Sequence, residues 1–366
     1  MKNTIGNNLH ITIFGESHGP YIGAVLDGLK PGIKIDYSFI DYMLSLRRPA
    51  GKISTSRVEA DQYQIISGVF EDKTKGSTLC IIIPNSSQHS KDYSELSHIA
   101  RPGHADFSAN CKYHGYQDYR GGGHFSGRIT AALVASAAIV IPVLKEKGIT
   151  IGSHIKKLAD VCDKDFDLEK LTEQIGELNK KTFAVLDDNS GALMVKEIEA
   201  AASEGDSVGG IIETAITGLP AGLGEPFFDS IESQLSHALF SIPGIKGVQF
   251  GAGFDKVCSR GSNFNDSFRI QNNKIITETN NNGGINGGIT NGMPVLFSCA
   301  VKPTPSIYKK QNTVDFKDMK DVELELTGRH DPAIIHRARV VVDSMVALVI
   351  YDILAGRFGT DLCNMD

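Results

Sequence analysis

The sequence predicts a fold that mixes helices and strands, built as two similar halves whose long apolar helices pack together in one core. Three observations support this prediction. Apolar residues recur at helical spacing in only a few places, strand-like runs lie between those places, and one stretch of the first half is echoed in the second. The chain has 366 residues, 41% hydrophobic and 22% charged, which is enough to bury one large core or two ordinary ones. We therefore expect a soluble globular protein, and halves that share one core predict a single domain over residues 1–366.

Helical spacing of apolar residues predicts four helices: Tyr37–Leu46, Ser126–Glu146, Asp229–Ser241 and Pro332–Ala355. The second contains the longest apolar run, from Ile129 to Leu144, which is shorter than the roughly 18 residues of a membrane span and includes Pro142. A buried helix is the better interpretation of this run.

Strands are expected where short apolar runs are bounded by glycine, proline or asparagine: Leu79–Ile83, Val208–Ile216 and Pro294–Val301. A more polar, less periodic segment at about 156–204 is expected at the periphery. The tract NNNGGINGGITNG at 280–292 has no core pattern, which is typical of a flexible loop unless it encloses a ligand.

The internal repeat links VLDGLKPGIKIDYSFIDYML at 25–44 with AITGLPAGLGEPFFDSIESQL at 215–235. Both read as a strand, a Gly-Leu pair, a Pro/Gly turn and a helix that opens near an aspartate. Each half later supplies one long apolar helix. The two-half hypothesis therefore requires these two helices to touch.

Charge and cysteine usage exclude several classes of protein. The formal net charge of −6 provides no general attraction to nucleic acid or to an anionic membrane, so neither partner is expected. The six cysteines are scattered singly, without a C-x-x-C pair, and we expect reduced thiols and no metal site. The first residues contain no recognisable export signal, which favours a cytoplasmic protein.

The stretch DYRGGGHFSGR at 118–128 combines three glycines with the start of a helix. It fails the Walker pattern, because Arg128 and Ile129 stand where Lys and Ser/Thr are needed, and it fails the dinucleotide fingerprint at Ser126. Exposed amides before a helix N-terminus still favour an anion. The alternative is structural, with Ser126 capping the helix and the glycines forming a turn.

Three further stretches pair glycine with histidine and a carboxylate: FGESHG at 14–19, RPGHAD at 101–106 and GRHDP at 328–332. A lone histidine is more often structural than catalytic, but His18 and His104 together are suited to proton transfer near neutrality. Asp331 before Pro332 also fits a helix cap, which does not exclude a catalytic role.

Arginine is abundant around these stretches, at positions 47, 48, 57, 101, 120, 128, 329, 337 and 339. Planar guanidinium groups suit paired carboxylate and phosphate oxygens, so the expected ligand is a polyanion. The stretch KPTPS at 302–306 adds a lysine and two hydroxyls, which suit either a phosphate site or an ordinary loop after a strand.

These stretches resemble the chorismate synthase family. FGESHG, RPGHAD, DYRGGG with SGR-x-TA, GLPAGLGEP, GGI-x-GGI, KPT-x-S and GRHDP occur in that family's order from residue 14 to residue 332. The resemblance implies an α+β fold in which helices pack between two antiparallel sheets, in a layered β-α-β sandwich, and a homotetramer.

The resemblance also implies a reaction: anti-1,4-elimination of phosphate from 5-enolpyruvylshikimate 3-phosphate, giving chorismate. Such enzymes need reduced FMN without consuming net reducing equivalents, and the flavin N5 takes the hydrogen from C6 of the substrate. Some members reduce their own flavin with NADPH, whereas others depend on an external reductant. The length of this chain and its lack of large insertions favour an external reductant.

Carried over by motif, the resemblance implies three catalytic residues. His18 lies by the flavin ring and helps to hold its reduced anionic form, His104 protonates the departing phosphate, and Asp331 assists proton removal at the flavin N5. Substrate-binding residues would be Ser17, Arg48, Arg57, Arg101, Arg128 and Arg329. Cofactor-binding residues would be Arg47, Ser126, Gly287, Lys302, Pro303, Thr304, Pro305, Ser306 and Arg329.

The chain departs from the family pattern at Lys52, His124 and Phe125. Relatives often carry arginine at the first two of these positions and a small polar residue at the third. His124 is then either a pH-dependent cation near a phosphate, which we favour, or a neutral packing group. Two rival functions also fit the basic pocket: an FMN-dependent reductase acting on another anion, and a non-catalytic protein that binds a phosphorylated metabolite.

Overall fold

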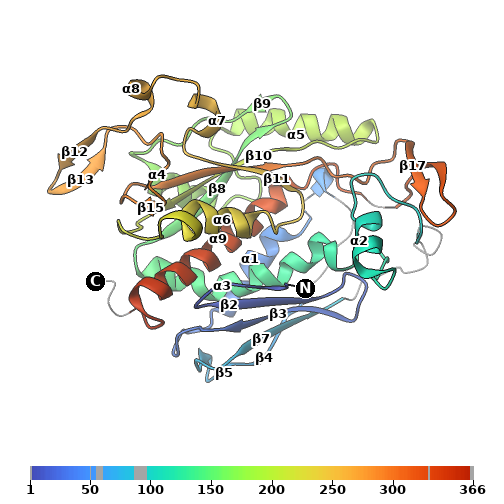
Figure 1. Ribbon diagram of the computed structural model, residues 1–366, viewed down its shortest axis with the longest axis horizontal. Coiled ribbons are helices and arrows are strands. Elements are labelled where there is room, and N and C mark those ends of the chain that lie inside the picture. Colours follow the sequence, from blue (N-terminus) through green and yellow to red (C-terminus); the bar gives the residue numbers. More distant parts are fainter. Residues whose placement is uncertain (1, 50, 55–60, 86–96, 329, 363–366) are drawn as a thin grey trace.

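Two antiparallel five-stranded sheets enclose a layer of helices in the computed structural model, which describes residues 2–49, 51–54, 61–85, 97–328 and 330–362 (Figure 1). The first sheet has the order β1-β2-β3-β7-β4, and the second has the order β11-β16-β10-β8-β9. This arrangement confirms the expected α+β sandwich.

The first half alternates buried and half-buried residues along its strands, so that one face of its sheet contacts the helices. In β7, Leu79, Ile81 and Ile83 are fully buried while the residues between them are partly exposed. The elements of this half are β1 (Thr4–Ile5), β2 (His10–Gly15), β3 (Tyr21–Asp27), α1 (Tyr37–Arg47), β4 (Gln64–Ser67), β7 (Leu79–Pro84) and α3 (Thr130–Glu146).

The second half repeats the plan of the first. Its elements are β8 (Thr150–Leu158), β9 (Val161–Cys162), β10 (Gly210–Thr217), α6 (Ile231–Leu239), β11 (Ile245–Phe250), β16 (Val295–Val301) and α9 (Ile335–Phe358). The series β2-β3-α1-β4-β7-α3 recurs as β8-β10-α6-β11-β16-α9, and the strands occupy matching positions in the two sheets. The weak repeat in the sequence therefore reflects a structural repeat.

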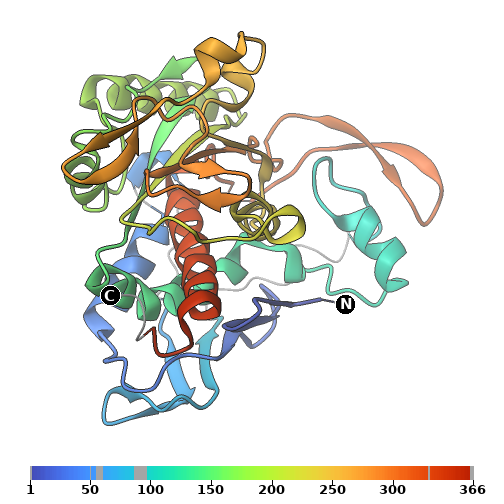
Figure 2. The same ribbon diagram turned by 60° about the vertical axis from the view of Figure 1, so that its left-hand side comes forward.

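The long helices α3 and α9 pack against each other in the middle of the molecule (Figure 2). Helix α3 also lies on β3 and β7, whereas α9 lies on β8 and β10. Both helices are apolar on nearly all sides because each is covered on nearly all sides. Their contact confirms the two-half hypothesis, and their N-terminal ends point to the same end of the helix layer, on the right in Figure 1.

One helical stretch in the described residues, Gly127–Glu146, is long and apolar enough to cross a membrane. However, 83% of its apolar window is buried inside the protein, as in the core helix of a globular fold. The predicted buried helix is confirmed at this position.

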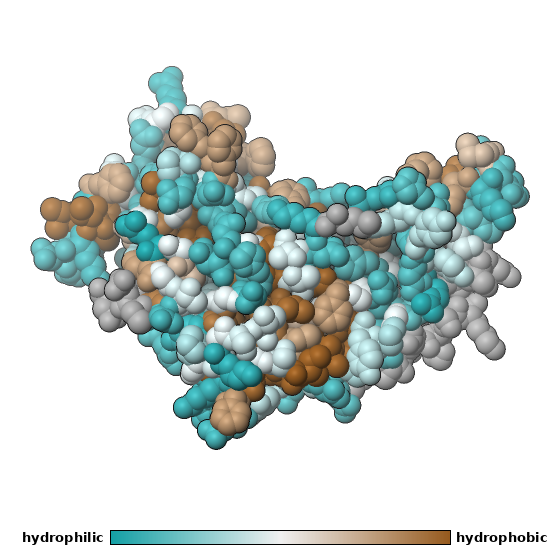
Figure 3. Space-filling model, turned by 60° about the horizontal axis from the view of Figure 1, so that its bottom comes forward, coloured by the Kyte–Doolittle hydropathy of each residue, from teal (hydrophilic) through white to brown (hydrophobic). Residues whose placement is uncertain are grey.

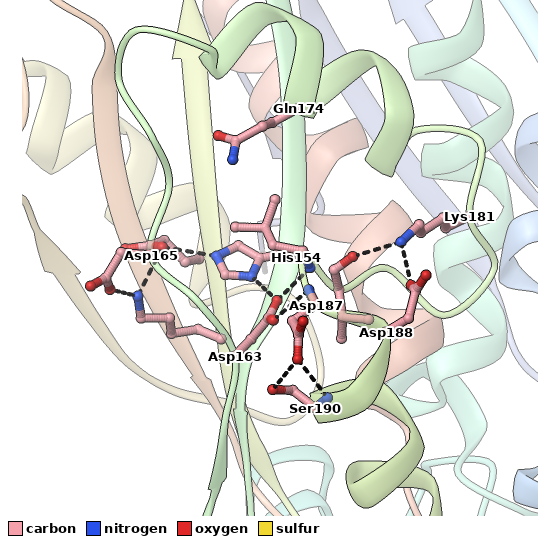
Figure 4. Close-up of polar contacts among 12 residues, drawn as sticks. His154, Asp163, Asp165, Gln174, Lys181, Asp187, Asp188 and Ser190 are labelled. Atoms are coloured by element: carbon pink, nitrogen blue, oxygen red, sulfur yellow. Dashed lines mark hydrogen bonds and ion pairs between the residues drawn. The ribbon is translucent and has the colours of Figure 1, made fainter.

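The polar segment at 156–204 supplies α4 (Leu171–Leu178) and α5 (Asp188–Ser203), and α4 covers the outer face of β8 and β10. A buried imidazole ties this segment to the sheet (Figure 4). His154 Nδ1 lies 2.8 Å from Asp163 Oδ2, and its Nε2 lies 2.9 Å from Glu213 Oε2. Asp163 also accepts hydrogen bonds from the Leu186 and Asp187 amides, which holds the chain just before α5.

Shorter elements form the edges of the molecule. They are η1 (Gly51–Ile53), β5 (Val69–Phe70), β6 (Lys73–Thr74), α2 (Asp106–Tyr113), η3 (Gly123–Phe125), η4 (Gly127–Ile129), η5 (Phe227–Asp229), α7 (Gly253–Lys256), α8 (Gly261–Phe264), β12 (Phe268–Gln271), β13 (Lys274–Thr277), β14 (Ile285–Asn286), β15 (Ile289–Thr290), β17 (Gln311–Asp315) and β18 (Lys320–Leu324).

Two local interpretations differ from the structure. Helix α9 begins at Ile335 rather than at Pro332, and its N-cap position, Ile334, makes no side-chain cap, so Asp331 is not the cap of this helix. The tract at 280–292 is not a featureless loop, because β14 and β15 pair as a hairpin. Gly287 and Gly288 form its two-residue turn with φ values of +61° and +85°, a conformation that glycine adopts readily.

Candidate active site

The histidine loop at 15–19 interlocks with the glycine turn at 121–124. The Ser17 amide donates to the Gly123 carbonyl at 3.0 Å, and His124 Nδ1 lies 2.9 Å from the Gly15 carbonyl oxygen. Asn85 holds the other side of the loop, because its Nδ2 donates to the Glu16 and Gly19 carbonyls. The loop is thus bound from both sides.

His18 lies within this loop, with only 5% of its surface exposed. Its Nδ1 lies 3.1 Å from Ser17 Oγ. Gly121 packs directly on the ring: a Cβ added to Gly121 would lie 2.4 Å from His18 Cε1, and Gly121 has a φ of +62°. The first glycine of the triplet is therefore required both by its backbone conformation and by the position of the imidazole.

Arg101 joins the second histidine loop to the first. Its guanidinium forms a bidentate pair with Asp106, through Nε at 2.9 Å and Nη2 at 2.7 Å. The same Nη2 donates to the Gly121 carbonyl at 2.6 Å. Arg101, which the sequence assigns to the substrate, thus also supports the backbone beside His18.

His104 contacts the stretch that follows β16. Its Nε2 lies 2.8 Å from Ser306 Oγ, and the Lys302 ammonium donates to the Gly103 carbonyl at 2.7 Å. A Cβ on Gly103 would lie 2.7 Å from Pro305 Cβ, so the two stretches are in close contact. RPGHAD and KPTPS, which lie some 200 residues apart in the sequence, form one surface.

Burial and the surrounding charges together keep the His104 imidazole neutral. Burial is the largest cause, and with the charges of Arg101, Lys302 and His330 it lowers the pKa of His104 to about 4, against an opposing effect of Asp106. Burial, and secondarily Lys246, also holds the pKa of the Lys302 ammonium below its usual range. Burial is the main cause of both shifts, and nearby cations add a smaller effect that an anionic ligand would offset.

Buried polar atoms next to these groups suit a phosphate-bearing ligand. Within the described residues, Thr304 Oγ1 and His330 Nε2 are buried without a hydrogen-bond partner. The Thr304 carbonyl accepts from Ser207 Oγ at 2.7 Å, which fixes the backbone between Pro303 and Pro305. An unsatisfied hydroxyl in KPTPS and an unsatisfied imidazole nitrogen in GRHDP fit a ligand that carries oxygen atoms.

Asp331 lies next to His330 and is held from the start of α9. Its Oδ2 accepts from Arg337 Nη2 at 2.6 Å. The His330 ring packs against Tyr308 with 5.0 Å between ring centroids, and burial together with the Arg101 charge lowers the pKa of His330. His330, Tyr308 and Arg337 were not assigned a role from the sequence, although His330 and Arg337 lie in or near GRHDP.

Arg47 and Arg128 share one buried carboxylate, Asp61. Arg47 Nη1 lies 3.4 Å from Asp61 Oδ2, and Arg128 pairs with Asp61 Oδ1. Arg47 also donates to the Gly127 and Arg128 carbonyls, and Arg128 donates to Asn85 Oδ1 at 3.1 Å. Sequence reasoning missed Asp61, which lies in none of the motifs. The one indication was the number of arginines, because arginines that become buried need a carboxylate as counter-charge.

Three other residues assigned from the sequence lie at a helix cap, in a groove and at a hairpin tip. Ser126 accepts from the Arg128 amide at 3.2 Å, so it caps the turn that leads into α3. Arg48 is the C-cap residue of α1 and lines a groove of about 770 Å³ together with Asp61. Gly287 lies at the tip of the β14–β15 hairpin, and no hydrogen bond within the described residues joins that hairpin to the histidine loops.

Four assigned or noted positions need separate comment. Arg57 and Arg329 lie outside the described residues, as does the side chain of Lys52. Phe125 is 42% exposed and its ring lies 6.2 Å from that of Tyr113, edge to face.

The chain is similar to known proteins over almost its whole length. The family model for chorismate synthase matches residues 9–355. The chorismate synthase of Pyrococcus abyssi is 44% identical over 352 residues, covering 96% of this chain and 97% of the relative. That of Methanobrevibacter smithii is 42% identical over 353 residues and covers 96% of each chain.

A solved structure described as a crystal structure of chorismate synthase superposes with a TM-score of 0.76 at 27% sequence identity, covering 97% of this chain and 94% of that one. Sequence and fold agree over almost the whole length. The chain therefore belongs to the chorismate synthase family, a family of flavin-dependent lyases.

Proposed function

We propose that this chain, acting as one domain in the cytoplasm, catalyses the reduced-FMN-dependent anti-1,4-elimination of phosphate from 5-enolpyruvylshikimate 3-phosphate to give chorismate, a step of aromatic amino acid biosynthesis. The observation that carries the assignment of residues is the surface shared by RPGHAD and KPTPS. It combines a neutral histidine, a lysine and unsatisfied polar atoms on one partly buried surface.

We assign the departing phosphate to this surface. His104 delivers the proton there, and Lys302 and Ser306, which are assigned to FMN, lie against the His104 loop. His104 is neutral before the substrate arrives, because burial and nearby cations lower its pKa to about 4. An anionic phosphate offsets those cations and raises the pKa, so His104 takes up a proton as the phosphate binds and returns it to the leaving oxygen.

His18 and Asp331 are assigned to the other reacting groups. The residues of KPTPS, with Arg47, Ser126 and Gly287, are assigned to FMN; when bound, reduced FMN supplies electron density to the allylic system. His18, fixed by Gly121 and Ser17, would lie by the flavin ring and help to hold its reduced anionic form. Asp331, oriented by Arg337, would assist proton removal at the flavin N5.

The substrate carboxylates are assigned to Arg48 and Arg128, together with Ser17, Arg57, Arg101 and Arg329. Arg128 is buried and held by Asp61, so its planar fork is pre-organised before a carboxylate arrives. Pre-organisation lowers the ordering cost of binding.

We infer that the protein assembles as a homotetramer, and one surface supports self-association. The helices that pack on the first sheet cover its inner face, whereas Phe14, Val25 and Ile82 lie half-buried on the outer face. Apolar residues gather in the middle of the lower face of the molecule (Figure 3). Such patches on globular proteins commonly mark interfaces.

An anaerobic assay tests the proposed function. The pure protein is mixed with the enolpyruvyl substrate and chemically reduced FMN, and chorismate and phosphate are followed. Stoichiometric release of both is expected, whereas no product would refute the assignment. Product from oxidised FMN with NADPH alone would identify a self-sufficient enzyme in place of the external reductant that we propose.

A His104→Ala variant separates the rival functions. An elimination catalyst retains substrate binding and loses turnover, whereas a non-catalytic binding protein keeps its only activity. Net oxidation of NADPH in step with product would instead favour a flavin-dependent reductase. Calorimetric binding and the chorismate assay together distinguish these results.

A further inference from the structure

The position at which the glycine stretch departs from the family pattern makes a specific contact with the His18 loop. We propose that His124 is a positioning residue whose Nδ1–H group holds the Gly15 carbonyl and thereby fixes the loop that carries Ser17 and His18. The inference rests on the proposed role of His18 in the reaction. It replaces our sequence-based preference for His124 as a cation beside a phosphate.

The contact determines where the hydrogen of the imidazole lies. His124 Nδ1 is 2.9 Å from the Gly15 carbonyl oxygen, and a carbonyl oxygen can only accept. Nδ1 therefore carries a hydrogen. Since both the Nδ1–H tautomer and the imidazolium carry this hydrogen, the bond forms whether or not the ring is charged.

The bond is one of a reciprocal pair. His124 donates to the backbone at Gly15, and the Ser17 amide donates back to the Gly123 carbonyl at 3.0 Å. Neighbouring residues of the turn thus bind neighbouring residues of the loop in both directions. The two bonds fix the distance between the turn and the loop.

His18 lies between the two anchors of its loop. Asn85 binds the Glu16 and Gly19 carbonyls on one side at 2.9 and 2.8 Å, while His124 binds Gly15 on the other. Gly121, in the same turn as His124, packs against the His18 ring. A shift of the turn relative to Gly15 is therefore transmitted directly to the imidazole.

The expected effect of losing the bond is a loss of turnover rather than of binding. A displacement of about 1 Å in a reacting group costs roughly 100-fold in rate. Since Ser17 and Asn85 still hold the loop, we expect His124→Ala to lower kcat about 10- to 100-fold. The KM for the substrate should change by less than kcat, because Ser17 is the residue of this loop that is assigned to the substrate and Asn85 still holds the loop.

Two amide variants separate hydrogen bonding from charge. The Asn side chain places an N–H close to the position of imidazole Nδ1, whereas the Gln side chain reaches the position of Nε2. Neither can become a cation. We expect His124→Asn to recover most of the lost kcat with the wild-type pH profile, and His124→Gln to behave like His124→Ala. His10→Asn is the matched control, because His10 is exposed at the start of the strand that ends at Gly15.

The measurements are kcat, KM for the substrate and the pH profile of kcat for each variant, with the melting temperature as a check on folding. Wild-type kcat in His124→Ala would overturn the proposal. The proposal would also be overturned if the Asn and Gln variants lost kcat equally, with a raised KM and a changed acid limb of the pH profile of kcat. That result would show that the charge of His124 matters. A fall in kcat that follows the melting temperature and is not rescued by Asn would also overturn it.

A measurement on the wild type that requires no activity separates this inference from the proposed function. The ring ¹⁵N shifts of labelled His124 report its tautomer in the absence of substrate. Hydrogen on Nδ1 is expected, and a neutral ring with hydrogen only on Nε2 would overturn the proposal. If the wild type produced no chorismate while His124 showed the Nδ1–H form, the assignment of function would fail and the anchoring contact would stand.

Discussion

Replacing Gly121 by alanine tests the packing that positions His18. The added Cβ would lie 2.4 Å from His18 Cε1 and 2.7 Å from Nδ1. Carbon atoms in contact lie about 3.5–4.0 Å apart, so the ring must move by about 1 Å. A shift of that size in a catalytic group costs roughly 100-fold in rate, equivalent to about 2.7 kcal/mol of transition-state stabilisation.

The same substitution also strains the backbone, because the φ of +62° at Gly121 is disfavoured for alanine by about 1–2 kcal/mol. Gly148→Ala is the matched control for this strain. Gly148 has a φ of +76°, and nothing lies within 4 Å of an added Cβ. Both variants should lose about 1–2 kcal/mol of unfolding free energy, but only Gly121→Ala should lose turnover.

The assay for this prediction combines anaerobic chorismate formation at saturating substrate with urea unfolding. A folded Gly121→Ala protein with wild-type kcat would refute the reasoning, because the ring would then tolerate the displacement. An equal loss of kcat in Gly148→Ala would also refute it, since backbone strain far from His18 would suffice.

Three further predictions concern protonation. Sulfate binding to the wild type at pH 7 should be accompanied by proton uptake at His104, because the bound anion offsets Arg101 and Lys302 and raises the His104 pKa from about 4. Calorimetry in two buffers with different ionisation enthalpies measures the number of protons taken up. Uptake that persists in His104→Ala would contradict this prediction. Lys302→Met should raise the pKa of His104 from about 4, because it removes one of the cations that lower this pKa. An NMR titration that shows the same His104 pKa in the variant and the wild type would disprove this effect of Lys302. His154→Gln should destabilise the fold by about 3 kcal/mol at pH 6, because it leaves the buried Asp163 carboxylate without its partner. Burial alone lowers the pKa of His154, but the hydrogen bonds to Asp163 and Glu213 outweigh this and raise it. The stabilisation is therefore complete below the unfolded pKa of about 6.5 and is lost as pH rises through the folded pKa. Urea unfolding measures the free energy of unfolding of the wild type and of His154→Gln at several pH values. If the difference between the two free energies grew as pH rises, this conclusion would be reversed.

Periodicity alone predicted the parts of the fold whose burial is simplest. Helix α3 and strand β7 are covered on their apolar faces, so their patterns in the sequence match their environments. The start of α9 was placed too early because Asp331-Pro332 resembles a helix start. In the structure the Asp331 carboxylate binds Arg337 instead, a tertiary contact that a local pattern does not contain.

The site was predicted as a set of residue types, not as a set of contacts. Glycine, histidine and arginine stretches indicated proton transfer and an anion, and the structure brings His18, Arg101, His104 and Ser306 into one chain of contacts. Asp61 escaped notice because it lies outside every motif, and its importance arises from the two arginines that fold around it. The direction of the His124 hydrogen bond depends on how the turn and the loop are placed in three dimensions.

The repeated plan of the two halves has a consequence for how activity is acquired. His18, Arg101 and His104 come from the first half, whereas Lys302, Ser306 and Asp331 come from the second, and the N-terminal ends of α3 and α9 bring the two sets together. A chain divided after Gly148 would separate the proposed proton donor, His104, from Lys302 and Ser306, and neither fragment would hold the complete proposed site. Chorismate would then form only when the two fragments associate through the contact between α3 and α9. The divided chain could therefore serve as a split-protein reporter of that association.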